Sequence, residues 1–299
     1  MIPIVEIFCL IDDFCKSFDE KCAQKYLPNP NRKRFRSCQM SISEVMMIVV
    51  MFHLSHYRTF KDFYFHCLSA HYRQEFPNLV SYNRFLELMP FTFMPLFVLQ
   101  SSLFGKETGK YFIDSTKLEV CHNLRIRSHR VFKNVAKRGK TSTGWFFGFK
   151  LHLVINNEGE IMKFWLTTGD VDDRKPVLQL VQNLKGWLFG DKGYISSTLW
   201  ENLKNQGLEL CTRVRKNMKA KVLEPAQEFL LSKRGIIESV IDQLKALLHI
   251  QHTRHRSVLN FQVNILAGLI AYTFKPKKPA VGFHELNHLD PFLNLLMPS

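Results

Sequence analysis

Apolar residues in the first hundred positions recur at the spacing of a helix. The opening stretch 4–18 follows this spacing, and the run Val45–Leu54 is long enough for a buried helix. Ser41 and Glu44 form a capping box ahead of that run, and another helix is expected after Thr59. The N-terminal part, residues 1–105, is therefore predicted to be an all-helical domain.

Two features bear on the role of this helical domain. A further short helix opens at Ser81 or Asn83, and residues 28–37 form a basic connection rich in Pro and Asn. Short helices with basic connections suit a DNA-binding unit of the helix-turn-helix type. A helical support domain fits the same pattern equally well.

The pattern changes after Thr108 to alternating strands and helices. Strands are expected at 110–116, 146–156, 160–169, 186–194 and 208–215, and helices at 172–184, 196–206, 232–249 and 257–272. The resulting order β, ββ, α, β, α, β, α, α predicts an α/β fold, with a mixed sheet flanked by helices. Residues 106–275 form this second domain, and residues 276–299 a C-terminal appendage.

Composition and net charge indicate which kind of partner the protein binds. A chain of 299 residues with 46% hydrophobic and 13% aromatic residues can bury a substantial core. The net charge of +15, from 41 Lys and Arg against 26 Asp and Glu, points to a polyanionic partner. Nucleic acid is the first candidate, an acidic membrane surface the second and an inert basic surface the third.

Cysteine usage and the N-terminus favour a cytoplasmic protein. The seven cysteines are scattered and form no CxxC pair, which argues against a zinc ribbon or a disulfide framework. The first residues carry acids where a signal peptide has a basic segment. The run Val45–Leu54 is too short to span a bilayer.

Three acids are expected where the catalytic side chains of a mixed sheet usually converge. Asp114 is expected to end the first strand, Asp191 ends a short apolar strand, and Glu238 lies on a helix that packs on the sheet. Three converging carboxylates repel one another unless cations neutralise them, and Mg²⁺ is the usual ion beside phosphates. Two such ions would clamp the attacking and leaving oxygens of a phosphoryl transfer.

The helix around Glu238 carries a mixed-charge stripe beside its apolar face. Arg234, Asp242 and Lys245 lie within about 40° of Glu238 at 100° per residue. Arg234 and Lys245 are candidates for holding phosphates, although Lys245 also fits a plain surface lysine. Asp242 is read as a surface partner of these cations, and the acids within 170–173 as helix caps or dipole partners.

Cations without acids fill the segment between the first two strands. The candidates for contact with a DNA backbone are Arg125, Arg127, Arg130, Lys133, Lys137, Arg138 and Lys140, and Lys150 follows. A solvated charge run is the alternative. The aromatic residues at 145–149 suit core packing of the strand better than stacking on a displaced base. Further phosphate contacts are expected at Arg213, Arg215, Lys216, Arg254 and Arg256.

These motifs together resemble a known family. FIDST at 112–116, FGDKGY at 189–194 and the helix with Arg234, Glu238 and Lys245 resemble the three acidic motifs of DDE transposases from bacterial insertion sequences. The tail at 251–272 resembles that of the insertion sequence 982 group. The resemblance covers residues 108–275 and implies a ribonuclease H-like core that cuts and joins transposon ends.

Residue by residue, the resemblance assigns Asp114, Asp191 and Glu238 as ligands of Mg²⁺ or Mn²⁺, with two ions, and Arg234 and Lys245 as further catalytic residues. Leu231 stands where related transposases have a tyrosine. The implied partner is double-stranded DNA, as terminal inverted repeats and as target, bound by a homodimer at the bacterial nucleoid. A ribonuclease H-fold nuclease without strand transfer, or an inactive DNA-binding descendant, are the alternatives.

Overall fold

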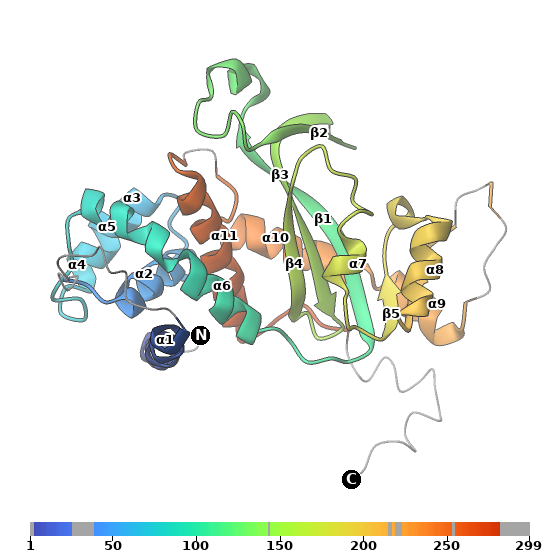
Figure 1. Ribbon diagram of the computed structural model, residues 1–299, viewed down its shortest axis with the longest axis horizontal. Coiled ribbons are helices and arrows are strands. Elements are labelled where there is room, and N and C mark those ends of the chain that lie inside the picture. The colour runs from blue at the N-terminus through green and yellow to red at the C-terminus, as the bar shows by residue number, and fades with distance from the viewer. Residues whose placement is uncertain are drawn as a thin grey trace, which may run out of the picture. The chain divides into compact units, whose positions relative to one another are not determined.

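The chain folds into two compact units (Figure 1). The computed structural model describes residues 3–25, 39–142, 144–214, 217–218, 223–252 and 255–281. The helical unit comprises Met1–Leu103, Leu244–Gln251 and His255–Pro276, and the sheet unit comprises Phe104–Gln243, His252–Arg254 and Lys277–Ser299. Leu244–Gln251 and His255–Pro276 come after the strands in the sequence, but they belong to the same compact unit as the N-terminal helices. The division into a DNA-binding domain, a catalytic domain and an appendage stays a prediction.

The helical unit is built around a buried helix. Its elements are α1 (Ile4–Lys25), α2 (Ile42–Leu54), α3 (Phe60–Phe63), η1 (Tyr64–Leu68), α4 (Ser69–His71), α5 (Tyr82–Leu88), η2 (Met89–Thr92), α6 (Phe93–Ser102) and α11 (Val258–Thr273). Because α2 is apolar on every side from Val45 to Phe52, it is buried on every side, between α1 and α11. The predicted helix at 257–272 is α11, which also packs against α6.

The predicted helix starts in this unit are confirmed. The Ser41 hydroxyl accepts from the Glu44 amide at 3.1 Å, and the Glu44 carboxylate accepts from the Ser41 amide at 2.6 Å, which is a complete capping box. Thr59 caps α3, and Ser81 rather than Asn83 caps α5. The basic connection at 28–37 lies outside the described residues. Both a helix-turn-helix DNA-binding role and a supporting role of this unit therefore stay predictions.

One helical stretch of this unit is long and apolar. Tyr82–Ser102, which joins α5, η2 and α6, has 21 residues with a mean hydropathy of 1.2, and 44% of its most apolar window is buried. A core helix of a globular protein passes the same test of length and composition. The stretch therefore does not by itself assign the protein to a membrane.

The sheet unit contains a six-stranded mixed sheet. Its strands are β1 (Lys110–Cys121), β2 (Lys137–Thr141), β3 (Gly144–Asn156), β4 (Ile161–Thr168), β5 (Gly186–Phe189) and β6 (Leu208–Cys211). Its helices and helical turns are η3 (Asn123–Ser128), α7 (Val177–Leu180), η4 (Lys192–Tyr194), α8 (Ser197–Asn205), α9 (Pro225–Ser232) and α10 (Gly235–Asp242), and η5 (Gln243–Leu247) follows α10.

The strands run in the order β2-β3-β1-β5-β6. The β1–β3, β3–β4 and β2–β3 pairs are antiparallel, and the β1–β5 and β5–β6 pairs are parallel. Residues 144–148 of β3 pair with β2, and residues 149–155 pair with β4. Helices flank this sheet (Figure 1), which confirms the predicted fold class. The hairpin at 156–159 between β3 and β4 is likewise as predicted.

Both faces of the central strands are covered. Tyr111, Ile113 and Val154 of β1 and β3 lie in one core cluster with residues of α7 and α8. On α10, which packs against β1, Ile237, Val240 and Ile241 are buried. The asymmetric burial of α10 fits the apolar face expected for this helix.

Several elements differ from the prediction; among them, α9 was not expected, and β6 ends at Cys211 rather than at 215. β1 continues to Cys121, so Asp114 lies within the strand rather than at its end, because buried Leu118 and Cys121 extend the pairing with β3. β2 was not expected. The helix expected at 172–184 is the short α7, because residues before it form a hydrogen-bonded turn. The helix expected at 232–249 begins only at Gly235, after the separate helix α9, and its last turn widens into the π-helix η5.

Candidate active site of the sheet unit

Two aspartates follow paired phenylalanines of neighbouring parallel strands, Asp114 within β1 and Asp191 just past the end of β5. Phe112 of β1 pairs with Phe189 of β5, and each phenylalanine is followed two residues later by an aspartate, Asp114 or Asp191. Because parallel strands in register advance together, the two carboxylates come from the same level of the sheet. The Phe-x-Asp spacing, which occurs twice in the sequence, therefore places each aspartate two residues beyond one of the two paired phenylalanines.

The Asp191 carboxylate is fixed by the turn that follows β5. Asp191 is the N-cap of η4, and its Oδ1 accepts a hydrogen bond from the Gly193 amide at 2.7 Å. A Cβ atom on Gly193 would stand 2.8 Å from this same oxygen. The glycine therefore leaves room for the carboxylate to lie over the turn.

Helix α10 brings a glutamate and an arginine to the same place. Arg234 lies at the N-terminus of α10, and its guanidinium contacts Glu238 Oε1 at 2.6 Å and Asp114 Oδ2 at 3.7 Å. The Asp114 Oδ1 atom accepts from the Ser115 amide at 2.8 Å. Asp242 is exposed, and the ion pairs of Arg234 within the described residues are with the other two acids, so Asp242 is not its partner.

Burial and the neighbouring acids change the protonation of Asp114. The pKa of Asp114 is raised to about 6, chiefly by burial and further by the nearby carboxylates of Asp191 and Glu238. The Ser115 amide and the Arg234 guanidinium lower the pKa but do not offset the burial. A nearby positive charge would stabilise the ionised form of a desolvated carboxyl that lies beside two other acids.

The chemistry of this donor set fits a hard divalent ion, which prefers carboxylate oxygens. Within the described residues, however, no group of three or more His, Cys, Asp or Glu side chains is arranged closely enough to hold a metal ion. The Arg234 guanidinium instead bridges two of the acids. Ion binding by all three acids would require this guanidinium or the carboxylates to shift.

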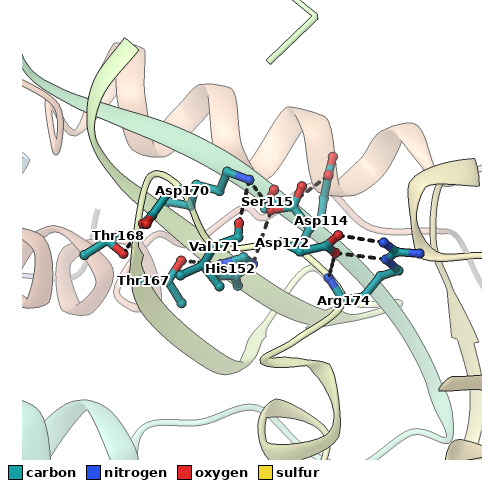
Figure 2. A network of polar contacts seen from close by, with 11 residues as sticks. Asp114, Ser115, His152, Thr167, Thr168, Asp170, Val171, Asp172 and Arg174 are labelled. Atoms are coloured by element: carbon teal, nitrogen blue, oxygen red, sulfur yellow. Dashed lines mark hydrogen bonds and ion pairs between the residues drawn. The ribbon is translucent and has the colours of Figure 1, made fainter. Parts of the chain in front are cut away.

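A second polar network lies on β3 and the loop after β4 (Figure 2). Lys150 is only 8% exposed, and its Nζ donates to Val171 O at 2.9 Å and to Asp173 Oδ1 at 3.0 Å. Lys150 is thus held within the sheet unit and does not belong to the exposed cations that precede it in the sequence. Asp173 is likewise the partner of a buried lysine rather than a helix cap.

His152 is the neutral member of this network. Its Nε2 lies 2.9 Å from Thr167 Oγ1, and burial, with a smaller effect of Lys150, lowers its pKa to about 4. The imidazole is therefore uncharged at neutral pH, and its 4.0 Å separation from Asp173 is not an ion pair there. Asp172 and Arg174 form a separate bidentate contact at 2.6 and 2.9 Å that closes the turn before α7.

Tyr194 is a structural residue of this region to which the sequence analysis gave no role. It follows Asp191 in η4 and is 2% exposed. Burial and the nearby carboxylates of Asp114, Asp173 and Asp191 raise its pKa well above the usual value. In the sequence, the position of this tyrosine at the end of the FGDKGY motif was the signal that could have indicated its structural role. Its buried ring anchors the turn that carries Asp191.

The other predicted site residues have diverse placements. Lys245 lies in η5 and by compactness belongs to the helical unit, so its role at the site stays a prediction. Leu231 is buried in α9, as its apolar side chain requires. Arg213 is exposed in the sheet unit and Arg256 in the helical unit, whereas Arg215, Lys216 and Arg254 lie outside the described residues.

The cations of the segment between β1 and β3 are all exposed. We call residues 122–142 the cationic arm; it includes η3 and β2 and extends past the ends of β1 and β3 (Figure 1). Its exposed cations are Arg125, Arg127, Arg130, Lys133, Lys137, Arg138 and Lys140. The arm is anchored by buried Phe132 and Ala136, which leaves the charged side chains in solvent. This placement agrees with either a DNA-binding surface or a solvated charge run.

The mixed sheet and its flanking helices have a ribonuclease H-like fold, consistent with the structural similarity given below. The chain belongs to the family of the transposase DDE domain, whose model matches residues 104–258, just over half of the chain. No curated protein sequence matches the chain. Among solved structures, the chain is similar to one described as the piggyBac transposase synaptic complex with hairpin DNA, determined by cryo-EM.

That structural similarity has a TM-score of 0.50 at 12% sequence identity, and covers 100% of this chain and 83% of the other. At this identity the likeness shows the fold alone. The family match and the fold together support a transposase of the DDE class, as the resemblance of the motifs implied.

Proposed function

We propose that the protein is a transposase that cleaves transposon ends and transfers the DNA strand in a reaction that depends on a divalent metal. The proposal rests mainly on the matching positions of Asp114 and Asp191 after paired phenylalanines of parallel strands, with Glu238 coupled to them electrostatically. We further propose that it is encoded by a bacterial insertion sequence of the 982 group and acts at the nucleoid as a homodimer.

In this proposal, Asp114, Asp191 and Glu238 hold Mg²⁺ or Mn²⁺, with two ions at the site. The bound ions would neutralise the phosphate and activate a water or a DNA 3′-hydroxyl as the nucleophile. Glu238 is paired with Arg234. On release from the carboxylates, the Arg234 guanidinium is well suited to hold a phosphate oxygen of the DNA.

The function is tested by incubating the full-length protein with DNA of the terminal repeats, a target plasmid and Mg²⁺ or Mn²⁺. The DNA flanking the reading frame supplies the repeats. Joined products would support the proposal. Cleavage without joining would show a nuclease, and binding without cleavage would show a DNA-binding protein without catalytic activity, and both results contradict strand transfer.

Substitution Gly193→Ala is expected to lower the cleavage rate about 10- to 100-fold, since small displacements of a catalytic group have effects of this size. The added Cβ would stand 2.8 Å from Asp191 Oδ1 and push the carboxylate from its place. Single-turnover cleavage measures the effect. The matched control is Gly235→Ala, whose Cβ meets no atom within 4 Å beyond its own chain neighbours. Equal rates for the two variants would contradict this role of Gly193.

Removal of charge from the cationic arm is expected to weaken DNA binding in a salt-dependent way. The triple variant Arg125→Ala, Arg127→Ala, Lys133→Ala should reduce the slope of log K against log salt by roughly 2 to 3, about 0.9 for each lost phosphate contact. Fluorescence anisotropy with duplex DNA at several salt concentrations measures the slope. An unchanged slope would identify the arm as a solvated charge run. Lys204→Ala, in α8, is the single-charge control.

A further inference from the structure

An exposed tryptophan lies at the start of β3, beside the cationic arm. Trp145 is 55% exposed, whereas Phe146, Phe147 and Phe149, which follow it on the strand, are buried. Core packing was the favoured reading of these aromatic residues from sequence, and it is correct for the three phenylalanines and wrong for Trp145. A large aromatic side chain held in solvent is a candidate for contact with a partner.

The backbone of Trp145 is fixed on both sides. It pairs with Lys140 of β2, and its carbonyl oxygen accepts a hydrogen bond from Asn123 Nδ2 at 2.7 Å. On β2, Gly139 packs so tightly that a Cβ would stand 2.1 Å from Gly169 O. Because side chains alternate along a strand, the neighbours of this glycine, Arg138 and Lys140, lie on the opposite face of β2, which Trp145 shares.

Two cations therefore lie over the indole ring, and each can move from the ring to a phosphate. The Arg138 guanidinium carbon lies 5.7 Å from the ring centroid, and Lys140 Nζ lies 5.8 Å from it. Both are within the range of a cation–π contact, which holds the ring and the charges together on one face of the strand pair. The result is an aromatic surface with positive charge next to it, exposed to solvent.

We propose that Trp145 stacks on an unpaired base of bound DNA, while Arg138 and Lys140 contact the phosphates beside that base. The proposal rests on the proposed function, which supplies DNA as the partner. Aromatic stacking beside a cationic groove is the general mode by which proteins bind single-stranded nucleic acid. Bases within a duplex are stacked on one another, so this contact requires an unpaired base, such as one beyond a cleaved end.

The charges favour this occupant over an apolar protein partner. The cationic arm, residues 122–142, contains no Asp or Glu in its sequence. Burying Trp145 under an apolar surface would also bury Arg138 and Lys140 without anionic partners, which is costly. A nucleotide satisfies all three side chains at once, because it presents an apolar ring face next to a phosphate.

The test compares two DNA molecules, a blunt duplex and the same duplex with a single-stranded extension, bound to the full-length protein. Trp145→Ala is expected to lower the affinity for the extended DNA roughly tenfold to a hundredfold, and to leave blunt-duplex binding nearly unchanged. Trp145→Phe, which keeps a ring, should lose less. In the wild-type protein the extension should quench tryptophan emission more than the blunt duplex does, and Trp145→Phe should remove that excess quenching.

The control is Trp165→Ala, which removes another exposed tryptophan of the same sheet, 45% exposed on β4, and should bind both molecules as the wild type does. Equal affinity of Trp145→Ala and wild type for the extended DNA would overturn the stacking proposal, as would an equal loss on both molecules. Failure of the proposed function is a different result, in which the wild-type protein binds or cleaves neither DNA. If Trp145→Ala did not fold, the quenching of the wild type and of Trp145→Phe would decide.

Discussion

Substitution Asp191→Asn is expected to reduce cleavage of transposon ends by a factor on the order of 10³ or more, with little change in binding of duplex DNA. Asp191 has a fixed carboxylate, at the same level as Asp114 on the adjacent parallel strand. An amide keeps the shape and still accepts from the Gly193 amide, but it lacks the negative charge that a divalent ion needs. Cleavage of end DNA and anisotropy with the same DNA measure the two effects.

The matched control for this variant is Asp242→Asn. Asp242 is an exposed acid on α10, the helix that carries Glu238, so it tests loss of one carboxylate without loss of the site. We expect this control to cleave at the rate of the wild type. Normal cleavage by Asp191→Asn, or an equal loss in the control, would show that the metal site is assigned to the wrong residues.

The acids of the site were predictable because their signal is local. Each aspartate stands two residues after a buried phenylalanine, and Glu238 stands on a helix whose apolar face is plain in the sequence. The same holds for the capping box at Ser41 and for the hairpin between β3 and β4, since each depends on a few adjacent residues. Local signals therefore predicted the fold class and the elements that carry the three candidate acids, but not that β1 continues past Asp114.

What could not be predicted depends on pairing between distant segments. β2 is a strand because Gly139 lets it pack against Gly169, which is separated from it by two strands in sequence. Lys150 looks like one more surface cation until the loop after β4 places Asp173 beside it. The exposure of Trp145 depends on the same β2–β3 register, so no pattern in residues 145–149 alone separates it from the three buried phenylalanines.

Substitution Asp114→Asn is expected to stabilise the protein at pH 7.5 while it abolishes cleavage. Burial raises the pKa of Asp114 from its ordinary value of 3.8 to about 6, so the folded state binds this proton more tightly than the unfolded state does. The stability of the wild type therefore falls as pH rises through roughly 4 to 6, and the cost above that range is about 3 kcal/mol. Asparagine cannot ionise, so the variant does not have this cost.

Urea unfolding of both proteins at pH 4, 5, 6 and 7.5 checks this result. The variant should match the wild type at pH 4, exceed it progressively up to pH 6, and keep a constant advantage at higher pH. Because bound cations relieve the same repulsion, Mg²⁺ or Mn²⁺ should stabilise the wild type at pH 7.5 and should not stabilise Asp114→Asn to the same extent. A difference in stability that is independent of pH would show that Asp114 is not the strained carboxyl of the site. A gain in stability together with a loss of cleavage would show that the fold tolerates unfavourable burial of this acid because its charge is needed for function.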